Sequence, residues 1–260
     1  MPSRHALLAT SFLLPLSVVL LLALSIPAIA GPPFLTDDPE PVKLHHYEFY
    51  AFGTFDRARD STLAQLPAAE FNVGAAPNLQ LHAILPLDYV HPGGAYGLGD
   101  VELGAKYRFV KEKGSRPQVG VFPLLELPTG NRRLGLGNGS VWARLPLWLQ
   151  KSFGPWTTYG GAGYQINRAP GMKDSLFAGW LLQRDLTKRI TLGGEFYHQE
   201  AQAAGARQTT FFDAGGYYKF SEGFNLLYML GHTITGERHT VGYLGLYWTW
   251  GRNSQDKQHN

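Results

Sequence analysis

The sequence predicts an all-β protein: an antiparallel transmembrane β-barrel of about twelve strands that follows a cleaved N-terminal signal peptide. Three observations indicate this fold class. Segments of about ten residues alternate between apolar and polar side chains, which is the period of a strand with two different faces. Long and short connections alternate between these segments, and aromatic residues gather at the segment ends.

The first element is the export signal that we expect in residues 1–30. Arg4 and His5 precede an apolar stretch over 6–24, and Ala28-Ile29-Ala30 ends the region with small residues. A basic start, an apolar middle and an A-x-A end are typical of a cleaved secretory signal. The alternative is an uncleaved anchor, because the apolar stretch approaches the ~20 residues that span a bilayer. We expect a Pro-rich segment over 31–43, the barrel over 44–250 and a polar tail over 251–260.

The clearest strand is 100–109. Val101, Leu103 and Tyr107 fall on one face, while Glu102 and Lys106 fall on the opposite face. A helix would mix the two sets, so the pattern favours a sheet with one apolar and one charged face. The expected strands, in chain order, are 46–51, 70–74, 79–89, 100–109, 118–127, 140–150, 156–165, 176–183, 190–199, 212–220, 224–232 and 243–250.

Proline interrupts three of these patterns. Pro86, Pro123 and Pro146 lie inside expected strands, where each removes one ladder hydrogen bond. Pro86 and Pro146 have the parity of the inner face. We therefore expect bulges or bends at these positions, with the strands continuing on either side.

The connections assign the two sides of the membrane. The long ones are 57–69, 128–139, 166–173, 200–208 and 233–239, and short ones at 75–78, 153–155, 186–189 and 221–223 lie between them. Intermediate connections fall at 91–96 and 111–117. Outer-membrane barrels have short periplasmic turns and longer external loops, so the even strand number places both termini in the periplasm.

Aromatic residues mark the expected periplasmic interface. Most of those near the periplasmic strand ends have outward parity, as expected for an interfacial girdle. The residues are Tyr47, Phe109, Phe153, Trp156, Phe220, Phe224 and Trp250.

Composition excludes several other classes. The chain has no cysteine, so a disulfide scaffold and thiolate chemistry are excluded. All 31 glycines follow residue 30, which makes the expected mature chain about 13% glycine against a usual ~7%. Lysine and arginine are scattered, with no basic tract longer than a pair, so we expect no nucleic-acid partner.

Several motifs resemble one known family. Gly97-Leu98-Gly99-Asp100 continues into the alternating strand up to Phe109, Glu126-Leu127-Pro128-Thr129-Gly130 precedes Gly135-Leu136-Gly137, and Pro32-Pro33-Phe34-Leu35-Thr36-Asp37-Asp38-Pro39 opens the chain after the signal. Together they are similar to the outer-membrane transporter family linked to the phenol meta-cleavage pathway (MetA-pathway of phenol degradation). The resemblance covers essentially the whole mature chain. It implies an outer-membrane location and transport, with hydrophobic or aromatic compounds as the solute class.

The end of the last strand is similar to the signal that the barrel-assembly machinery reads. That signal has a polar residue, a glycine two positions later, and aromatics five and seven positions later. Tyr243, Gly245, Trp248 and Trp250 occupy these places. The polar tail 251–260 departs from the pattern, because the signal usually ends the chain. The expected partners are therefore outer-membrane lipids and this machinery.

Charged residues with inward parity are the candidate pore-lining residues. Eight acids face four bases on the inner face, and His46 and His82 lie beside them. One interpretation is an interior packed with neutralising ion pairs, and the other is a pore whose acidic excess favours cations or neutral solutes. The candidates are Asp100, Glu102, Lys106, Arg108, Glu126, Arg144, Glu195, Asp213 and Lys219.

Other chemistries find little support. Residues 97–99 and 135–139 are glycine-rich, but no helix and no Lys-Ser/Thr pair follow, so we expect no nucleotide site. His45 and His46 point to opposite faces of a strand, so at most one joins Glu48 and we expect no metal. A rim lipase would have only His198 with Ser175 or Ser140, at no supporting spacing.

The sequence thus predicts a non-enzymatic barrel without a cofactor, acting as a passive pore or facilitator. Glu102, Lys106, Arg108 and Arg144 are the positions chosen to test it. The alternative is a plugged structural or surface-interaction barrel whose external loops 57–69 and 128–139 contact partners. The residue pattern leaves open whether 31–43 plugs the lumen or lies in the periplasm.

Overall fold

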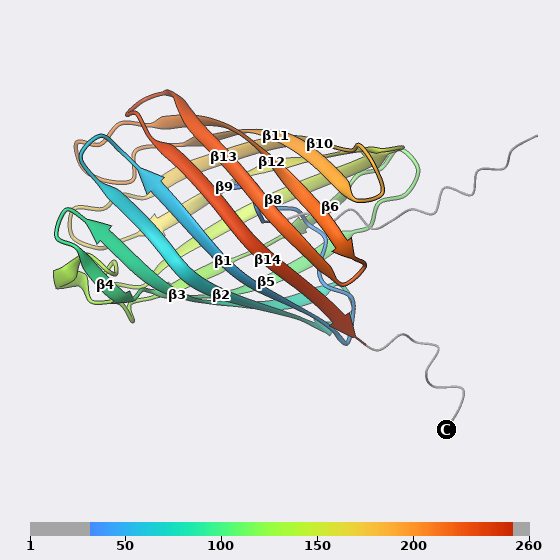
Figure 1. Cartoon of the computed structure of the whole chain (residues 1–260), viewed down its shortest axis with the longest axis horizontal. Coiled ribbons are helices and arrows are strands. Elements are labelled where there is room, and N and C mark those ends of the chain that lie inside the picture. The colour runs from blue at the N-terminus through green and yellow to red at the C-terminus, as the bar shows by residue number, and fades with distance from the viewer. Residues whose placement is uncertain (1–31, 252–260) are drawn as a thin grey trace, which may run out of the picture.

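The computed structural model describes residues 32–251, and these residues form a closed antiparallel β-barrel of twelve spans (Figure 1). The expected signal over 1–30 and the tail beyond Gly251 lie outside the described residues. The strands are β1 (His46–Arg57), β2 (Thr62–Ala76), β3 (Leu79–His91), β4 (Ala95–Leu98), β5 (Val101–Val110), β6 (Gln118–Val121), β7 (Leu124–Leu127), β8 (Trp142–Phe153), β9 (Trp156–Asn167), β10 (Ser175–Asp185), β11 (Ile190–Gln199), β12 (Thr209–Ser221), β13 (Phe224–Thr235) and β14 (Thr240–Gly251).

Two of the twelve spans are interrupted strands. β4 and β5 are two parts of one span, because both pair with β3. β6 and β7 are likewise parts of one span between β5 and β8. The barrel closes where β1 pairs with β14 along its whole length, from His46 opposite Gly251 to Arg57 opposite Thr240. The predicted fold class and strand number are confirmed.

The two faces of the wall differ as the alternation predicts. Large apolar side chains on the outer face are exposed, for example Leu103, Tyr107 and Phe109 at 42–51%. Their neighbours on the inner face are mostly buried, among them Lys106, Gln118 and Glu195. In lipid this arrangement pairs the backbone groups of neighbouring strands with one another and leaves the apolar face to the acyl chains.

Four of the seven expected girdle residues, Tyr47, Phe220, Phe224 and Trp250, form ring contacts on the outer face, at the end expected to face the periplasm. The ring centroids of Tyr47 and Trp250 are 5.8 Å apart, and those of Tyr47 and Phe71 are 6.0 Å apart. Phe224 stacks on Trp248 at 5.0 Å and on Phe220 at 5.1 Å. These contacts join β12, β13, β14, β1 and β2 across the closing seam.

The external connections differ in length from one side of the barrel to the other. The connection expected over 57–69 is wrong: β2 already begins at Thr62, so the loop is only 58–61. The bulge between Gln65 and Ala68 takes up Pro67 without ending the strand. The loop 92–94 is also shorter than expected, because β4 extends the span. The connection after β7 is the longest and contains the 3-10 helix η1 (Arg132–Leu134).

The inner-face prolines act in two ways. Pro86 lies opposite the bulge of β2, and its carbonyl accepts from the N–H of Gly99, at the break between β4 and β5. Pro146 leaves β8 continuous, as expected, and no bulge forms there, because the register with β9 runs through Pro146 without a shift. The interruption falls on the neighbouring span instead, where Phe122 and Pro123 separate β6 from β7.

No helix among the described residues is long and apolar enough to cross a membrane.

Candidate functional site: the lumen and its N-terminal segment

The nine candidate pore-lining residues all lie at inward-facing positions of the wall. Lys106, Glu195 and Asp213 are buried, and the other six are partly buried. The structure does not bring them together as one cluster. Asp100, Glu102 and Glu126 lie towards the external end, and Lys219 lies near the periplasmic turn after β12.

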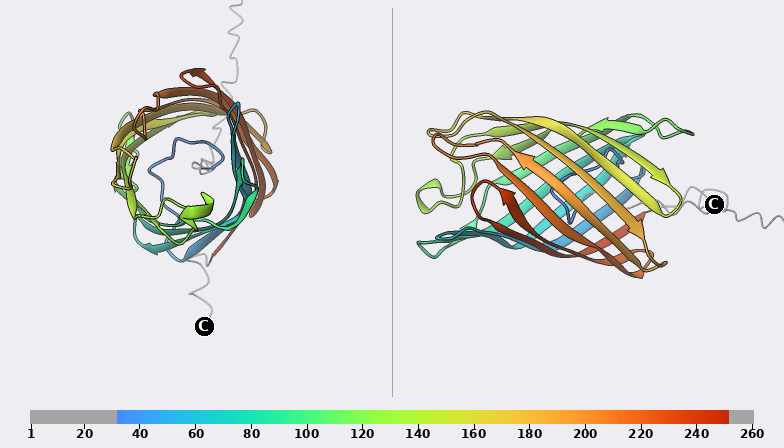
Figure 2. Two further views of the ribbon diagram at one scale, coloured as in Figure 1. Left: turned by 90° about the vertical axis from the view of Figure 1, so that its left-hand side faces the viewer. Right: turned by 90° about the horizontal axis from the view of Figure 1, so that it is seen from above.

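The lumen contains the N-terminal segment, residues 32–45, which enters the barrel before the chain turns into β1. Seen along the barrel axis, this segment runs inside the ring of strands (Figure 2). Pro33, Thr36, Asp38 and Pro39 are fully buried, at under 2% exposure. The structure therefore answers the question that the sequence left open: this segment occupies the lumen.

Glu195 on β11 holds the first part of the segment. Its carboxylate accepts hydrogen bonds from the backbone N–H of Leu35, at 2.9 Å, and from that of Thr36. Glu195 is fully buried, and its bond from Thr36 forms away from water, where a hydrogen bond to a carboxylate is strong. This side chain, predicted as a pore-lining charge, serves here as a bidentate anchor for the segment's backbone.

Lys106 on β5 holds the second part of the segment through two acids. Its Nζ lies 2.8 Å from Asp37 Oδ1 and 3.3 Å from Asp38 Oδ2. Burial raises the pKa of the Asp38 carboxyl, and the Lys106 ammonium acts in the opposite direction. Asp37 is closer to the ammonium and partly exposed, so we treat Asp37 as the principal charge partner of Lys106.

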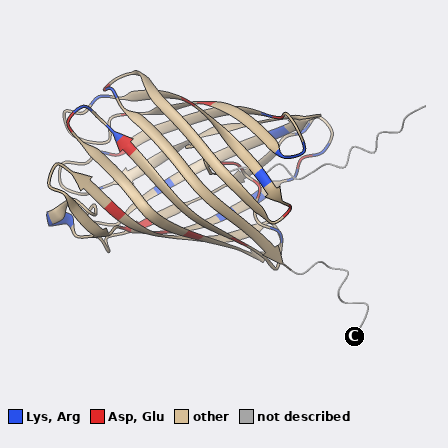
Figure 3. Cartoon of the chain, in the orientation of Figure 1, with Lys and Arg blue, Asp and Glu red and all other residues tan. Residues whose placement is uncertain are grey.

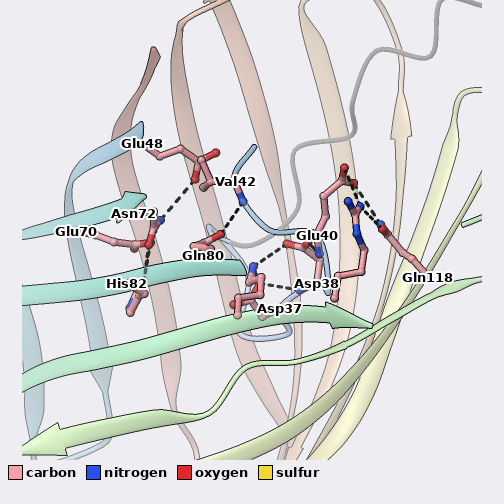
Figure 4. A network of polar contacts seen from close by, with 12 residues as sticks. Asp37, Asp38, Glu40, Val42, Glu48, Glu70, Asn72, Gln80, His82 and Gln118 are labelled. Carbon is pink, nitrogen blue, oxygen red and sulfur yellow. Dashed lines mark hydrogen bonds and ion pairs between the residues drawn. The ribbon is translucent and has the colours of Figure 1, made fainter. Parts of the chain in front are cut away.

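Glu40 and Val42 complete the attachment (Figure 4). Arg108 Nη1 lies 3.5 Å from Glu40 Oε1, and Gln118 donates to Glu40 Oε2 at 3.2 Å. Gln80 on β3 accepts from the N–H of Val42 at 3.0 Å. The segment thus crosses the lumen from β11 to β3, with polar contacts on four strands.

Glycines on the inner wall allow the segment to approach it closely. A Cβ on Gly179 would lie 1.8 Å from Thr36 Oγ1, and one on Gly74 would lie 1.9 Å from the carbonyl oxygen of Lys43. Any larger residue there would collide with the segment. Part of the glycine enrichment seen in the sequence therefore has a specific structural role.

A second polar network lies on β1, β2, β3, β5 and β14, beside the segment, and Figure 4 shows its part on β1, β2 and β3. The ring nitrogens of His82 lie 2.7 Å from Asn72 Oδ1 and 2.8 Å from Glu102 Oε1. Asn72 also donates to Glu70 at 2.8 Å. Glu48 accepts from Tyr247 at 2.8 Å. This part of the wall resembles the expected interior of mutually satisfied groups.

Ion pairs form inside the lumen, but some of their acids come from outside the strands. The sequence predicts an interior packed with neutralising ion pairs, and the structure takes the acidic partners of Lys106 and Arg108 from the N-terminal segment. Arg144 has no acidic partner among the described residues. It packs over the Phe177 ring, 4.1 Å from the centroid, and donates to the hydroxyl of Tyr197. Its charge is stabilised by an aromatic face.

Aromatic side chains form much of the remaining lumen lining. These side chains point into the lumen and are buried there. The buried inward-facing aromatics are Tyr50, Phe52, Phe122, Trp148, Tyr159, Phe177, Tyr197, Phe211, Tyr217, Tyr243 and Tyr247. Tyr243 of the expected assembly signal is one of them and stacks on Phe52 at 5.2 Å, whereas Trp248 and Trp250 belong to the outer girdle.

The remaining candidate chemistries do not assemble. His198 lies 2.9 Å from Thr210 Oγ1 on the outer face, whereas Ser175 is buried on the inner face and accepts from Gln199. A Ser–His pair is therefore not formed between them. No group of three His, Asp or Glu side chains that could hold a metal occurs within residues 32–251.

Comparison with known sequences identifies the family. The sequence model described as "Putative MetA-pathway of phenol degradation" matches residues 49–249, which is most of the barrel. The chain belongs to this family. A search of the curated proteins found no match. The family resemblance predicted from the glycine-rich strand motifs is confirmed.

Solved structures show the same barrel at low sequence identity. The COG4313 outer membrane channel from Pseudomonas putida F1 superposes with a TM-score of 0.65 at 16% identity, covering 85% of this chain and 100% of that one. The KdgM porin gives 0.53 at 11% identity, with 77% and 99% coverage. The translocator domain of the autotransporter NalP from Neisseria meningitidis gives 0.53 at 13%, with 78% and 88% coverage. These neighbours are outer-membrane barrels, and they establish the fold.

Proposed function

We propose that this barrel is a passive outer-membrane channel for small solutes, with hydrophobic or aromatic compounds as the substrate class. The observation that carries the proposal is that a segment of non-strand chain, rather than side chains of the wall alone, fills the lumen. Barrels of about eight strands are filled by their own side chains, whereas 16–18 strands enclose an open channel. Here a length of non-strand chain, held by side-chain contacts and hydrogen bonds, occupies the space. When this segment is displaced, a passage opens along the lumen, inside the closed wall of strands.

The lining supports the solute class. Trp148, Phe177 and Tyr197 lie next to one another on the inner face. The ring centroid of Phe177 is 6.2 Å from that of Trp148 and 6.3 Å from that of Tyr197. Flat apolar faces with a polar edge suit a small aromatic solute that carries a hydroxyl group. The family's name and the channel and porin titles among the structural neighbours agree with this proposal.

The proposed route to the membrane follows the sequence. Residues 1–30 direct export, and Tyr243, Gly245, Trp248 and Trp250 are read by the barrel-assembly machinery. Substituting Trp250 by Ala should slow assembly. The measurement is the fraction of newly made protein that reaches the heat-modifiable, folded form in cells.

The decisive experiment compares the full mature chain with a variant that lacks residues 32–43. Planar-bilayer conductance and liposome swelling are measured on both, with phenol and a pentose sugar as the two solutes. We expect small, intermittent conductance from the full chain and larger, steady conductance from the deletion variant. Heat-modifiable gel migration confirms that both are folded barrels. A folded deletion variant that passes neither ions nor either solute would exclude the channel.

The second candidate function is a plugged barrel that presents its external loops to a partner. The occupied lumen favours it. The loop after β1 is only 58–61, so the longer loop 128–141 is the main candidate surface for contact with a partner. The same two measurements separate the candidates, because a structural barrel has no reason to conduct when the segment is absent.

A further inference from the structure

A cationic cavity lies on the external rim of the barrel, outside the lumen. It has a volume of about 870 Å³ and lies between the loops 58–61 and 236–239. Arg57, Arg59 and Arg238 line it together with His232. We call this set of four residues the rim site.

The rim site faces the membrane side of the wall. Arg57 at the end of β1 lies opposite Thr240 on β14, and Thr240 lies opposite His232 on β13. Residues opposite one another in a sheet point to the same face, so the three share the outer face. His232 Nδ1 lies 3.1 Å from Thr240 Oγ1, a contact on that exposed face.

Apolar side chains lie directly below the rim site on the same outer face. Leu230 is 61% exposed and Leu244 is 61% exposed. Phe55, 39% exposed, precedes Arg57 by two residues and therefore shares its face. The cavity thus begins where the acyl-chain region of the membrane ends, at the depth of lipid headgroups.

The three arginines have no acidic partner. None of them forms an ion pair within residues 32–251, whereas Arg168 on another external loop pairs with Asp174 at 2.7 Å. Asp60 and Glu237 also line the cavity, and Glu237 lies 3.8 Å from His239. The balance of the lining is positive. Figure 3 shows that Lys, Arg, Asp and Glu are sparse along the strands and frequent in the loops at this end of the barrel.

The loops on this side leave the site open to a headgroup. The connections 58–61 and 236–239 are four residues each, while 128–141 on another part of the rim is much longer. A lipid in the outer leaflet can therefore reach the arginines without a loop covering them.

We propose that the rim site binds the phosphate groups of a phosphorylated glycolipid in the outer leaflet. Guanidinium groups recognise phosphate bidentately, and three unpaired ones around one cavity match a headgroup with two phosphates. The cavity is large enough for a sugar phosphate. Acyl chains on the apolar residues below would hold the headgroup at this depth. This inference does not depend on whether the barrel conducts.

The test measures binding of diphosphoryl lipid A to the purified, delipidated mature protein by native mass spectrometry. The test variant is Arg57→Gln/Arg59→Gln/Arg238→Gln. The matched control is Arg132→Gln/Arg133→Gln/Arg207→Gln, which removes three arginines from other external loops. We expect at least a tenfold loss of affinity in the test variant and no change in the control. Monophosphoryl lipid A should bind more weakly than the diphosphoryl form, and phosphatidylcholine should show no difference between variants.

Two results would overturn the proposal. Equal binding of lipid A by the test variant and the wild type would show that the arginines are not the site. Inorganic pyrophosphate binding as tightly as diphosphoryl lipid A, and competing with it, would make the cavity a small-anion site with no preference for lipid. Heat-modifiable migration of both variants ensures that lost binding reflects the site, and an additional Arg→Lys triple variant should retain part of the affinity.

Discussion

Lys106 offers the sharpest test of how the N-terminal segment is held. Replacing it with methionine keeps the length and apolar body of the side chain but removes the ammonium that contacts Asp37 and Asp38. Both carboxylates then face a buried position without a cation. Release of the segment returns them to water, so the substitution should shift the segment from docked to released.

The size of the shift follows from the burial of the pair. The Lys106 side chain is 5% exposed, that of Asp38 is 0% and that of Asp37 is 22%. Removing one partner of a buried pair costs about 3–5 kcal/mol. The partial exposure of Asp37 and the raised pKa of Asp38 reduce this cost, which places the effect near the lower value. At about 1.4 kcal/mol per factor of ten, the docking equilibrium falls roughly 100-fold.

The assay uses the absence of cysteine in the chain. A single Thr36→Cys substitution places a thiol at a position with 0% exposure, and a water-soluble maleimide reaches it only when the segment is released. We expect Lys106→Met to accelerate labelling about 100-fold. Lys219→Met, which removes an inward lysine that does not contact the segment, is the matched control and should leave the rate unchanged.

A charge rescue completes the argument. Asp37→Asn and Asp38→Asn, added to Lys106→Met, remove the uncompensated charges and should restore slow labelling. If Lys106→Met labels no faster than the wild type, the ion pair does not hold the segment. If the triple substitution labels as fast as Lys106→Met alone, the loss is one of packing rather than of charge.

Three further predictions concern other parts of the molecule. Gly179→Val introduces a side chain where Thr36 now lies, so labelling at a cysteine in position 36 should rise and conductance should become steadier. Asp100→Ala removes the carboxylate that accepts two backbone N–H groups of the loop 128–141, at 2.7 and 2.9 Å, and trypsin should cut this loop several-fold faster. Arg144→Glu reverses an unpaired inward charge, so reversal potentials in a salt gradient should shift towards cation selectivity.

Each of these predictions has its own control. Gly194→Ala on β11 adds a methyl group with only ordinary contacts at 3.6 Å and should not change labelling. Asp174→Ala perturbs a different external loop and should not accelerate cutting within 128–141. Arg144→Gln should give half or less of the selectivity shift of Arg144→Glu. Unchanged selectivity in both would indicate that Arg144 is remote from the ion path.

Local sequence was sufficient to predict the wall of the barrel. Side chains two apart share a face of a strand, so 100–109 revealed its lipid side and its lumen side without any tertiary information. The number of spans and the girdle around Tyr47 and Trp250 follow from the same period. Strand ends were less certain: the pattern predicts the second strand over 70–74, whereas a bulge absorbs Pro67 and β2 begins at Thr62.

The N-terminal segment shows where local pattern stops being informative. Asp37 and Lys106 are 69 residues apart, and no period connects them. Their pairing depends on the closure of β1 against β14, which encloses a space, and on wall glycines that leave room inside it. The Pro-rich composition of 31–43 is compatible with a position inside or outside the barrel.

Sequence by itself thus determined which side chains contact lipid and which face inward, because that choice depends on neighbours two residues away. Only the tertiary structure decided which inward charges meet each other and which arginines on the rim have no partner. Those outcomes depend on distances between residues on different strands and loops. Such distances are set when the sheet closes, and no single segment of the chain contains them.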